Sequence, residues 1–188
     1  MKKKSNIISD FTENSPFKGL FAELFKQSKL NLHMAGVIRV TSSGSSHLST
    51  KQPHEIINPT GRGDWISNNA PNAFLQIDFR SYLFHPTYYS LSFYSMKKDN
   101  RIKSWVMQGS VDGSSWFCLD EVRLNRRFDS SQISCAMFSD IPVRFVRICQ
   151  IGKNLSGNNV LSLHQIEFFG ELVYDSKAPI RLKTAGFM

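Results

Sequence analysis

The side chains that could do chemistry are not spaced as in a catalytic or metal site. No serine nucleophile elbow and no phosphate-binding Walker loop occurs. A dinucleotide-binding loop beginning at Gly61 would need its third glycine where Ile66 stands. Paired carboxylates for hydrolysis stay an open alternative that nothing in the sequence supports. The histidines lack the spacing of metal ligands: His33, His47, His54, His85 and His164. The sequence therefore predicts a protein that is not an enzyme and that needs neither a cofactor nor a metal.

Cationic side chains gather in two segments. Residues 96–103 hold four cations against one acid, and such a segment attracts an anionic partner by Coulomb forces. A solvated charged loop on a basic protein is an equally good interpretation of each segment. The sequence does not show whether the two share one face. The cations are Lys97, Lys98, Arg101 and Lys103 in the first cluster and Arg123, Arg126 and Arg127 in the second.

Two short motifs have simpler explanations than the functions they suggest. Arg62-Gly63-Asp64 spells an integrin-binding tripeptide, but three residues recur by chance, and Gly61 and Gly63 permit a tight turn before Trp65. Asn154-Leu155-Ser156 matches the glycosylation sequon, which we expect to stay unmodified because no signal peptide precedes it. The surrounding polar loop, residues 152–159, could hydrogen-bond a sugar or a peptide, although loop geometry explains its composition.

Length and composition favour a single folded domain. The chain has 188 residues, of which 41% are hydrophobic and 20% charged, so wholesale disorder is excluded. The formal net charge of +8 favours acidic partners such as nucleic acid, an anionic membrane or an acidic protein surface.

Nothing in the sequence indicates export or membrane insertion. The basic start lacks the apolar stretch of a secretory signal, and no run reaches the ~18 apolar residues of a membrane span. Cys118, Cys135 and Cys149 form neither a disulfide framework nor a zinc site, so we expect free buried thiols in a reducing compartment. We predict a soluble cytoplasmic protein, which could also be associated with the cytoskeleton.

The amino-terminal third predicts an arm followed by a helix. Residues 1–14 are polar and lack periodicity, as in a mobile arm or docking tail. A helical lead-in is expected within 15–35, with Ser15 as the cap and Pro16 at the first helical position. Its apolar stripe could serve a partner or a membrane, but packing over its own domain is the favoured interpretation. The stripe consists of Phe17, Leu20, Phe21, Leu24 and Phe25.

After Gly36 the pattern becomes that of β-strands. Asp112-Gly113 predicts the turn of a hairpin, and residues 172–188 lack alternation and are expected to form a tail. About eight short antiparallel strands separated by polar loops predict an all-β sandwich or barrel. The expected strands are 37–41, 73–79, 87–95, 105–111, 116–119, 135–138, 143–150 and 161–169.

Six sequence blocks in a fixed order carry a resemblance to a known family. They are residues 65–67, 74–79, 89–93, 104–116, 144–148 and 161–170. Together they resemble the discoidin domain, or coagulation factor V/VIII type C domain, of the galactose-binding-like superfamily, and most of all its intracellular protist versions. The resemblance covers residues 36–171. It implies a jelly-roll sandwich that binds ligands with loops at one end and does no chemistry.

The family plan gathers three loops at the binding end. These are residues 43–48 with His47, residues 58–64 with Arg62 and Asp64, and residues 96–103. Extracellular members tie the domain ends with a disulfide, but no cysteine lies near residue 36 or 171, which favours an intracellular version. Membrane-binding members carry apolar loop tips, whereas these loops are polar, so we expect no membrane insertion.

Three binding functions follow from this resemblance and the charge. The first is an adaptor that docks on an acidic protein surface, such as tubulin in the microtubule lattice or another cytoskeletal assembly. The alternative is a lectin-like carbohydrate-binding domain, for which the loops offer His47 but no Trp or Tyr at their tips. Nucleic-acid binding is disfavoured because most aromatic residues are expected to be internal.

Overall fold

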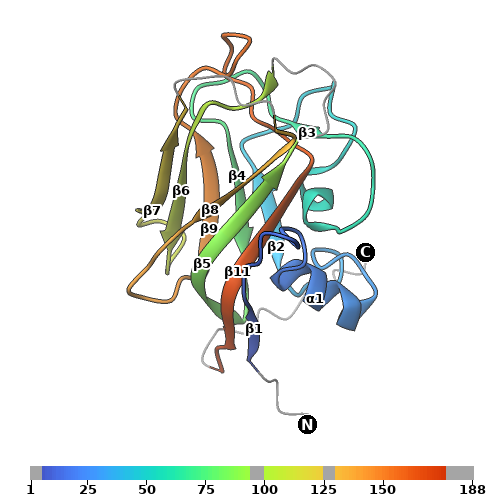
Figure 1. Ribbon diagram of the computed structural model, residues 1–188, viewed down its shortest axis with the longest axis vertical. Coiled ribbons are helices and arrows are strands. Elements are labelled where there is room, and N and C mark those ends of the chain that lie inside the picture. The colour runs from blue at the N-terminus through green and yellow to red at the C-terminus, as the bar shows by residue number, and fades with distance from the viewer. Residues whose placement is uncertain (1–5, 94–99, 125–129, 177–188) are drawn as a thin grey trace, which may run out of the picture.

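The chain folds into a sandwich of two antiparallel sheets. The computed structural model describes residues 6–93, 100–124 and 130–176. One sheet has the order β1-β11-β5-β8, the other has the order β2-β4-β9-β6-β7, and β10 pairs with β3 in a small third sheet (Figure 1). The all-β sandwich predicted from the alternating pattern is therefore confirmed. The elements are β1 (Ile7–Ser9), α1 (Leu20–Ser28), β2 (Arg39–Ser42), the 3-10 helix η1 (Pro53–Ile57), β3 (Trp65–Ile66), β4 (Phe74–Asp78), β5 (Tyr82–Ser92), β6 (Ser104–Ser110), β7 (Phe117–Arg123), β8 (Gln132–Ala136), β9 (Phe145–Gln150), β10 (Ser162–Leu163) and β11 (Gln165–Tyr174).

Alternating side chains build the core between the sheets. Leu75 and Ile77 of β4 point inward and are buried, as the period-two pattern requires. A polar chain crosses this core: Trp105 Nε1 donates to Tyr89 Oη at 2.8 Å, and Tyr89 Oη donates to Asp120 at 2.7 Å. Burial raises the pKa of Tyr89, so its hydroxyl stays protonated and links the two sheets.

The helix packs on its own domain but begins later than expected. It starts at Leu20 rather than at Ser15, and Gly19 occupies the N-cap position without a side-chain hydrogen bond. The cap comes instead from β11, where the Glu167 carboxylate accepts from the backbone N–H groups of Phe21 and Ala22 at 2.8 and 3.1 Å. The predicted Ser15 cap is wrong because a distant carboxylate satisfies these donors. The interpretation of the helix as a cover for the sandwich is confirmed by its buried side chains, which are Leu20, Phe21, Ala22 and Leu24.

Part of the expected amino-terminal arm is a strand. Ile7–Ser9 form β1 and pair with β11, with Ile7 opposite Leu172. Phe11 then stacks on Tyr88 with ring centroids 4.5 Å apart. Residues 6–11 are therefore docked on the sheet. Their sequence lacks periodicity, but pairing with β11 holds them there.

The last strand is longer than expected and contains a bulge. β11 continues to Tyr174, so the expected tail boundary at 172 is wrong; residues 177–188 lie outside the described part of the chain. The ladder shifts register after Phe169, where Gly170 faces Pro86. Gly170 has φ +131°, and a Cβ there would lie 2.0 Å from the carbonyl oxygen of His85. A side chain at this position would therefore collide with the backbone of β5.

The hairpin predicted at Asp112-Gly113 is present. The Asp112 carboxylate accepts from the backbone N–H groups of Ser114 and Ser115 at 2.7 and 2.8 Å. Gly113 has φ +81°, which a residue without a Cβ adopts without strain. These bonds hold the pKa of Asp112 below its usual value.

The three cysteines are free thiols, but only one is fully buried. Cys149 is buried, Cys135 is partly exposed and Cys118 is exposed on β7. Desolvation raises the pKa of all three thiols, which keeps them protonated and weakly nucleophilic near neutral pH. The expectation of buried thiols is therefore wrong for Cys118, which lies on the edge strand of the five-stranded sheet.

Candidate functional site

Several loops meet at one end of the sandwich, the upper end in Figure 1. Ser46 N donates to the Ile66 carbonyl at 2.8 Å, and Asn159 N donates to Asn69 Oδ1 at 2.9 Å. Leu155 N donates to the carbonyl of Arg101 at 3.2 Å. We call this region the loop end, and it comprises residues 43–50, 58–72, 100–103 and 151–161. The first two predicted binding loops, and the described part of the third, lie within it.

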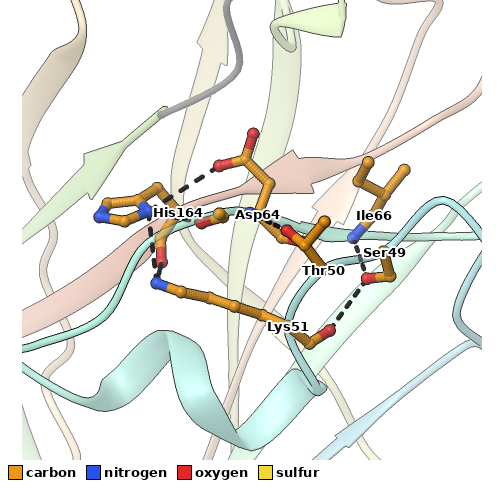
Figure 2. A network of polar contacts seen from close by, with 7 residues as sticks. Ser49, Thr50, Lys51, Asp64, Ile66 and His164 are labelled. Atoms are coloured by element: carbon orange, nitrogen blue, oxygen red, sulfur yellow. Dashed lines mark hydrogen bonds and ion pairs between the residues drawn. The ribbon is translucent and has the colours of Figure 1, made fainter.

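A buried polar network supports the loop end from below (Figure 2). Lys51 is only 5% exposed, and its Nζ donates to the His164 carbonyl at 2.8 Å. His164 Nδ1 lies 2.6 Å from the carbonyl oxygen of Gly63. We assign the ring proton to Nδ1, because a carbonyl oxygen can only accept. Lys51 and His164 thus hold the loop that contains Gly63 against β11.

Asp64 is fixed on the other side of the same loop. Its N–H donates to Thr50 Oγ1 at 3.0 Å, and its carbonyl accepts from the N–H groups of Thr50 and Lys51. The carboxylate is buried, with Oδ1 4.0 Å from His164 Nδ1. Burial lowers the pKa of Lys51, and the nearby carboxylates of Asp64 and Glu55 oppose this shift.

The same geometry explains the Arg62-Gly63-Asp64 tripeptide. An integrin ligand has to offer the aspartate carboxylate to its receptor, but the Asp64 side chain is only 7% exposed. Gly63 has φ +92°, and a Cβ there would lie 2.1 Å from Thr50 Oγ1. The tripeptide therefore forms a bend at Gly63 before Trp65, without a backbone hydrogen bond across it among the described residues.

Two predicted site residues are exposed on the loops that this network holds in place. Arg62 and His47 are both exposed, and Leu48 beside His47 is 62% exposed. Ser49 Oγ accepts from Ile66 N at 2.8 Å and donates to the Lys51 carbonyl at 3.0 Å, so it joins the two loops (Figure 2). A loop backbone that is already held in place loses little conformational entropy when a ligand binds.

The basic residues of the third loop are placed differently. Lys97 and Lys98 lie outside the described residues, and Lys103 is half-buried. Arg101 is buried, and its Nη1 donates to the Ser130 carbonyl at 3.1 Å. Arg101 therefore serves the structure of the loop end, although its charge suggested a surface role.

The described parts of the two basic clusters adjoin each other. Arg123 pairs with Ser104 across the β6–β7 ladder, and Leu124 N donates to the Lys103 carbonyl at 2.8 Å. Arg123 is exposed and forms an ion pair with Glu121 at 2.6 Å; Arg126 and Arg127 lie outside the described residues. Lys103 and Arg123 thus lie on adjoining backbone segments, and Glu121 offsets part of the charge of Arg123.

Some residues of the site gave little sign of their role in the sequence. Lys51 looked like one of many surface lysines, and His164 like an isolated strand histidine. Asn154 is buried; its side-chain amide donates to Asn158 Oδ1 at 2.6 Å and to the Val160 carbonyl at 3.2 Å. The sequon asparagine therefore shapes its own loop, and its amide nitrogen is enclosed.

The tryptophan of the loop end is part of the core. Trp65 is fully buried, with Nε1 donating to Ser45 Oγ at 2.9 Å. Within residues 6–93, 100–124 and 130–176, no three His, Cys, Asp or Glu side chains are grouped to hold a metal ion. No helix in these ranges is long and apolar enough to cross a membrane.

Comparison with solved structures shows the fold. The lectin domain of lectinolysin complexed with Lewis B antigen superposes with a TM-score of 0.56 at 13% identity, covering 70% of this chain and 91% of that one. The CBM32-5 module of CpGH89 from Clostridium perfringens, in complex with GalNAc-β-1,3-galactose, gives 0.58 at 12% identity, covering 72% and 96%. The CBM32 of AlyQ, in complex with 4,5-unsaturated mannuronic acid, gives 0.53 at 18% identity, covering 69% and 92%.

Sequence comparison adds evidence from a curated relative. The chain is 31% identical over 150 residues to the E3 ubiquitin-protein ligase Ufd4 of Drosophila melanogaster, which covers 73% of this chain but only 5% of the ligase. The chain thus spans about a twentieth of that relative, and no protein-family model matches it. The resemblance to the discoidin domain in particular stays a prediction. The structure has the β-sandwich fold that is also found in CBM32 and lectin modules.

Proposed function

We propose that this protein is a non-catalytic module that binds glycans at its loop end. The observation that carries the proposal is the pair of exposed polar side chains, Arg62 and His47, on loops fixed by the buried Lys51–His164 network. The similar solved structures are complexes with Lewis B antigen, GalNAc-β-1,3-galactose and an unsaturated uronic acid. Those ligands support a sugar as the ligand class.

The exposed chemistry suits a polar ligand with one apolar face. The Arg62 guanidinium offers several N–H donors to hydroxyl or carboxylate oxygens. His47 can donate or accept, and the neighbouring Leu48 presents an apolar surface to the C–H face of a sugar ring. This contact replaces the aromatic platform that sugar-binding sites often use.

A glycan array with matched variants tests the proposal. We expect wild-type protein to bind a defined subset of glycans, and Arg62→Ala or His47→Ala to weaken that binding about tenfold, or ~1.4 kcal/mol. Arg39→Ala, which removes an exposed arginine outside the loop end, is the matched control and should keep the binding of neutral glycans. Absence of any bound glycan, or equal binding by all variants, would refute the proposal.

A second candidate is docking on an acidic protein. It rests on the 31% identity to part of a ubiquitin ligase and on the neighbouring cations Lys103 and Arg123. Nothing in the described residues or the comparisons supports microtubules as the partner, so tubulin binding and the cytoplasmic location stay predictions. Co-sedimentation with microtubules at low and moderate salt tests tubulin as the acidic partner, and absence of pelleting at low salt would end that prediction.

A further inference from the structure

A basic hollow lies away from the loop end, where the chain passes from α1 to β2. It has a volume of about 310 Å³. Two arginines and a histidine contribute to its wall, and no acidic residue does. The lining residues are His33, Met34, Gly36, Ile38, Arg39 and Arg80.

Separate segments bring these cations together. Arg39 begins β2 and pairs with Asp78 of β4, so the β4–β5 turn at Arg80 lies next to it. His33 comes from the segment after α1, and His54 of η1 stacks on its ring with centroids 4.8 Å apart. His33 Nδ1 accepts from the Val40 N–H at 3.0 Å, so its proton is on Nε2 and the ring can donate from there.

The charge of the hollow is not neutralised by its own wall. Burial lowers the pKa of His33, and His54, Arg39 and Arg80 lower it further, as expected for a group among cations. The neighbouring carboxylate of Asp78 is engaged elsewhere. Its oxygens accept from Arg144 Nε and Nη2 at 2.9 and 3.2 Å and from the Arg80 N–H at 2.8 Å. Glu55 of η1 accepts from Gln52 N at 2.6 Å.

Arg80 occupies a backbone conformation that arginine does not favour. Its φ is +61°, a left-handed value that glycine or asparagine adopts at lower cost. The bond from its N–H to Asp78 holds this turn. The turn itself therefore needs no arginine, whereas the wall of the hollow gains a guanidinium from it.

We propose that the hollow binds a tetrahedral oxyanion, a phosphate or sulfate group, between the guanidinium groups of Arg39 and Arg80, with His33 and His54 as further donors. Guanidinium groups bind such oxygens through two parallel charge-assisted hydrogen bonds. This site goes beyond the proposed glycan binding, because it lies elsewhere and selects a charged group.

NMR titration of the full chain with inorganic phosphate and with sulfate, at constant ionic strength, tests the site. We expect saturable shifts of the His33 and His54 ring signals that chloride does not produce, and a rise of the His33 pKa on binding, because the bound anion favours the charged ring. Shifts that are linear in concentration, or equal for chloride, would overturn the proposal.

Two variants each remove one of the proposed anion-binding guanidinium groups and should leave the fold intact. Arg80→Asn keeps a residue that tolerates the left-handed turn, and Arg39→Gln keeps a polar side chain on an edge strand. Each should weaken phosphate binding about tenfold, while thermal melting of Arg80→Asn stays at or above the wild-type midpoint. Asn72→Gly, at another left-handed position (φ 58°), is the matched control and should bind phosphate like wild type. Unchanged affinity in both arginine variants would refute the assignment.

Two further experiments identify the source of the anion and distinguish this site from the loop end. Phosphoserine and galactose 6-sulfate are compared as probes, and the tighter one indicates whether the group comes from a phosphorylated amino acid or a sulfated sugar. Arg62→Ala should keep phosphate binding, and Arg80→Asn should keep the binding of neutral glycans. Failure of the glycan array would therefore leave this site standing, and the reverse also holds.

Discussion

At the scale of single residues, Glu167 determines where the helix begins. It is fully buried on β11, and its carboxylate accepts from the N–H groups of Phe21, Ala22 and Phe168 at 2.8, 3.1 and 2.9 Å. Desolvation raises its pKa to about 7, although the backbone donors favour the charged form. This single side chain thus accepts hydrogen bonds from N–H groups at the helix start, which have no local cap.

Replacing this carboxylate should destabilise the protein. In Glu167→Gln the amide nitrogen cannot accept the hydrogen bond that the second oxygen accepts. We expect a loss of ~1–3 kcal/mol in the free energy of unfolding, measured by urea denaturation at pH 5. Glu171→Gln, whose carboxylate accepts only an exposed bond from Asn6, is the control and should change stability little. Equal stability of the Glu167 variant and wild type would show that the carboxyl group, which is protonated at this pH, does not hold the helix.

The same residue predicts a pH dependence of stability. Its pKa is raised from 4.5 to about 7 in the folded state, so the folded protein binds the extra proton between these values. The contribution of Glu167 therefore falls by roughly 3 kcal/mol as the pH rises from about 4.5 to 7. Comparison with Glu167→Gln isolates it from other titrating groups such as His33. The destabilisation caused by the substitution should be largest near pH 5 and shrink toward pH 8, and a difference independent of pH would contradict the raised pKa.

At the scale of elements, the pairing of β5 with β11 depends on one glycine. Gly170→Ala should cost more than ~2 kcal/mol, because the new Cβ would collide with the His85 carbonyl at a positive φ. Gly157→Ala is the matched control: it also has a positive φ, +78°, but nothing lies within 4 Å of its Cβ, so about 1 kcal/mol is expected. Thermal unfolding followed by circular dichroism measures both, and equal losses would show that the close contact is relieved elsewhere.

Hydrogen bonds from side chains hold two loops of the loop end in place. The turn at Gly63 is clamped between Thr50 and His164, while Asn154 closes the loop that follows β9. His164 is half-buried and Asn154 is buried, so these two side chains position the surface of the loop end from within. This division explains why Asp64 and Arg101 support the site from within, whereas Arg62 and His47 are exposed on it.

At the scale of the whole molecule, the sandwich separates two candidate binding regions. The loop end lies where β3 and the turns before β4 and β6 meet, and the basic hollow lies at the opposite end of β2 and β4, near Arg39 and Arg80. Each region can be altered without touching the residues of the other. The tests of neutral-glycan and phosphate binding are therefore independent of each other.

The sequence alone determined the β-sandwich class, most strand positions and the hairpin at Asp112-Gly113. These features follow from side-chain alternation and from turn residues that act on their immediate neighbours. It also indicated the bend at Gly61-Arg62-Gly63. The missed first half of β5 contains Pro86, whose missing N–H argues against a strand until the bulge opposite Gly170 is known.

Which side chains come together depends on the packing of segments that are distant in the sequence. The Glu167 carboxylate caps a helix 146 residues away, and Lys51 binds His164 across 113 residues. The burial of Asp64 and Arg101, and the convergence of His33, Arg39 and Arg80, likewise depend on how distant segments pack. Spacing along the chain encodes local periodicity, whereas such contacts arise only when the sheets stack and their connecting loops meet.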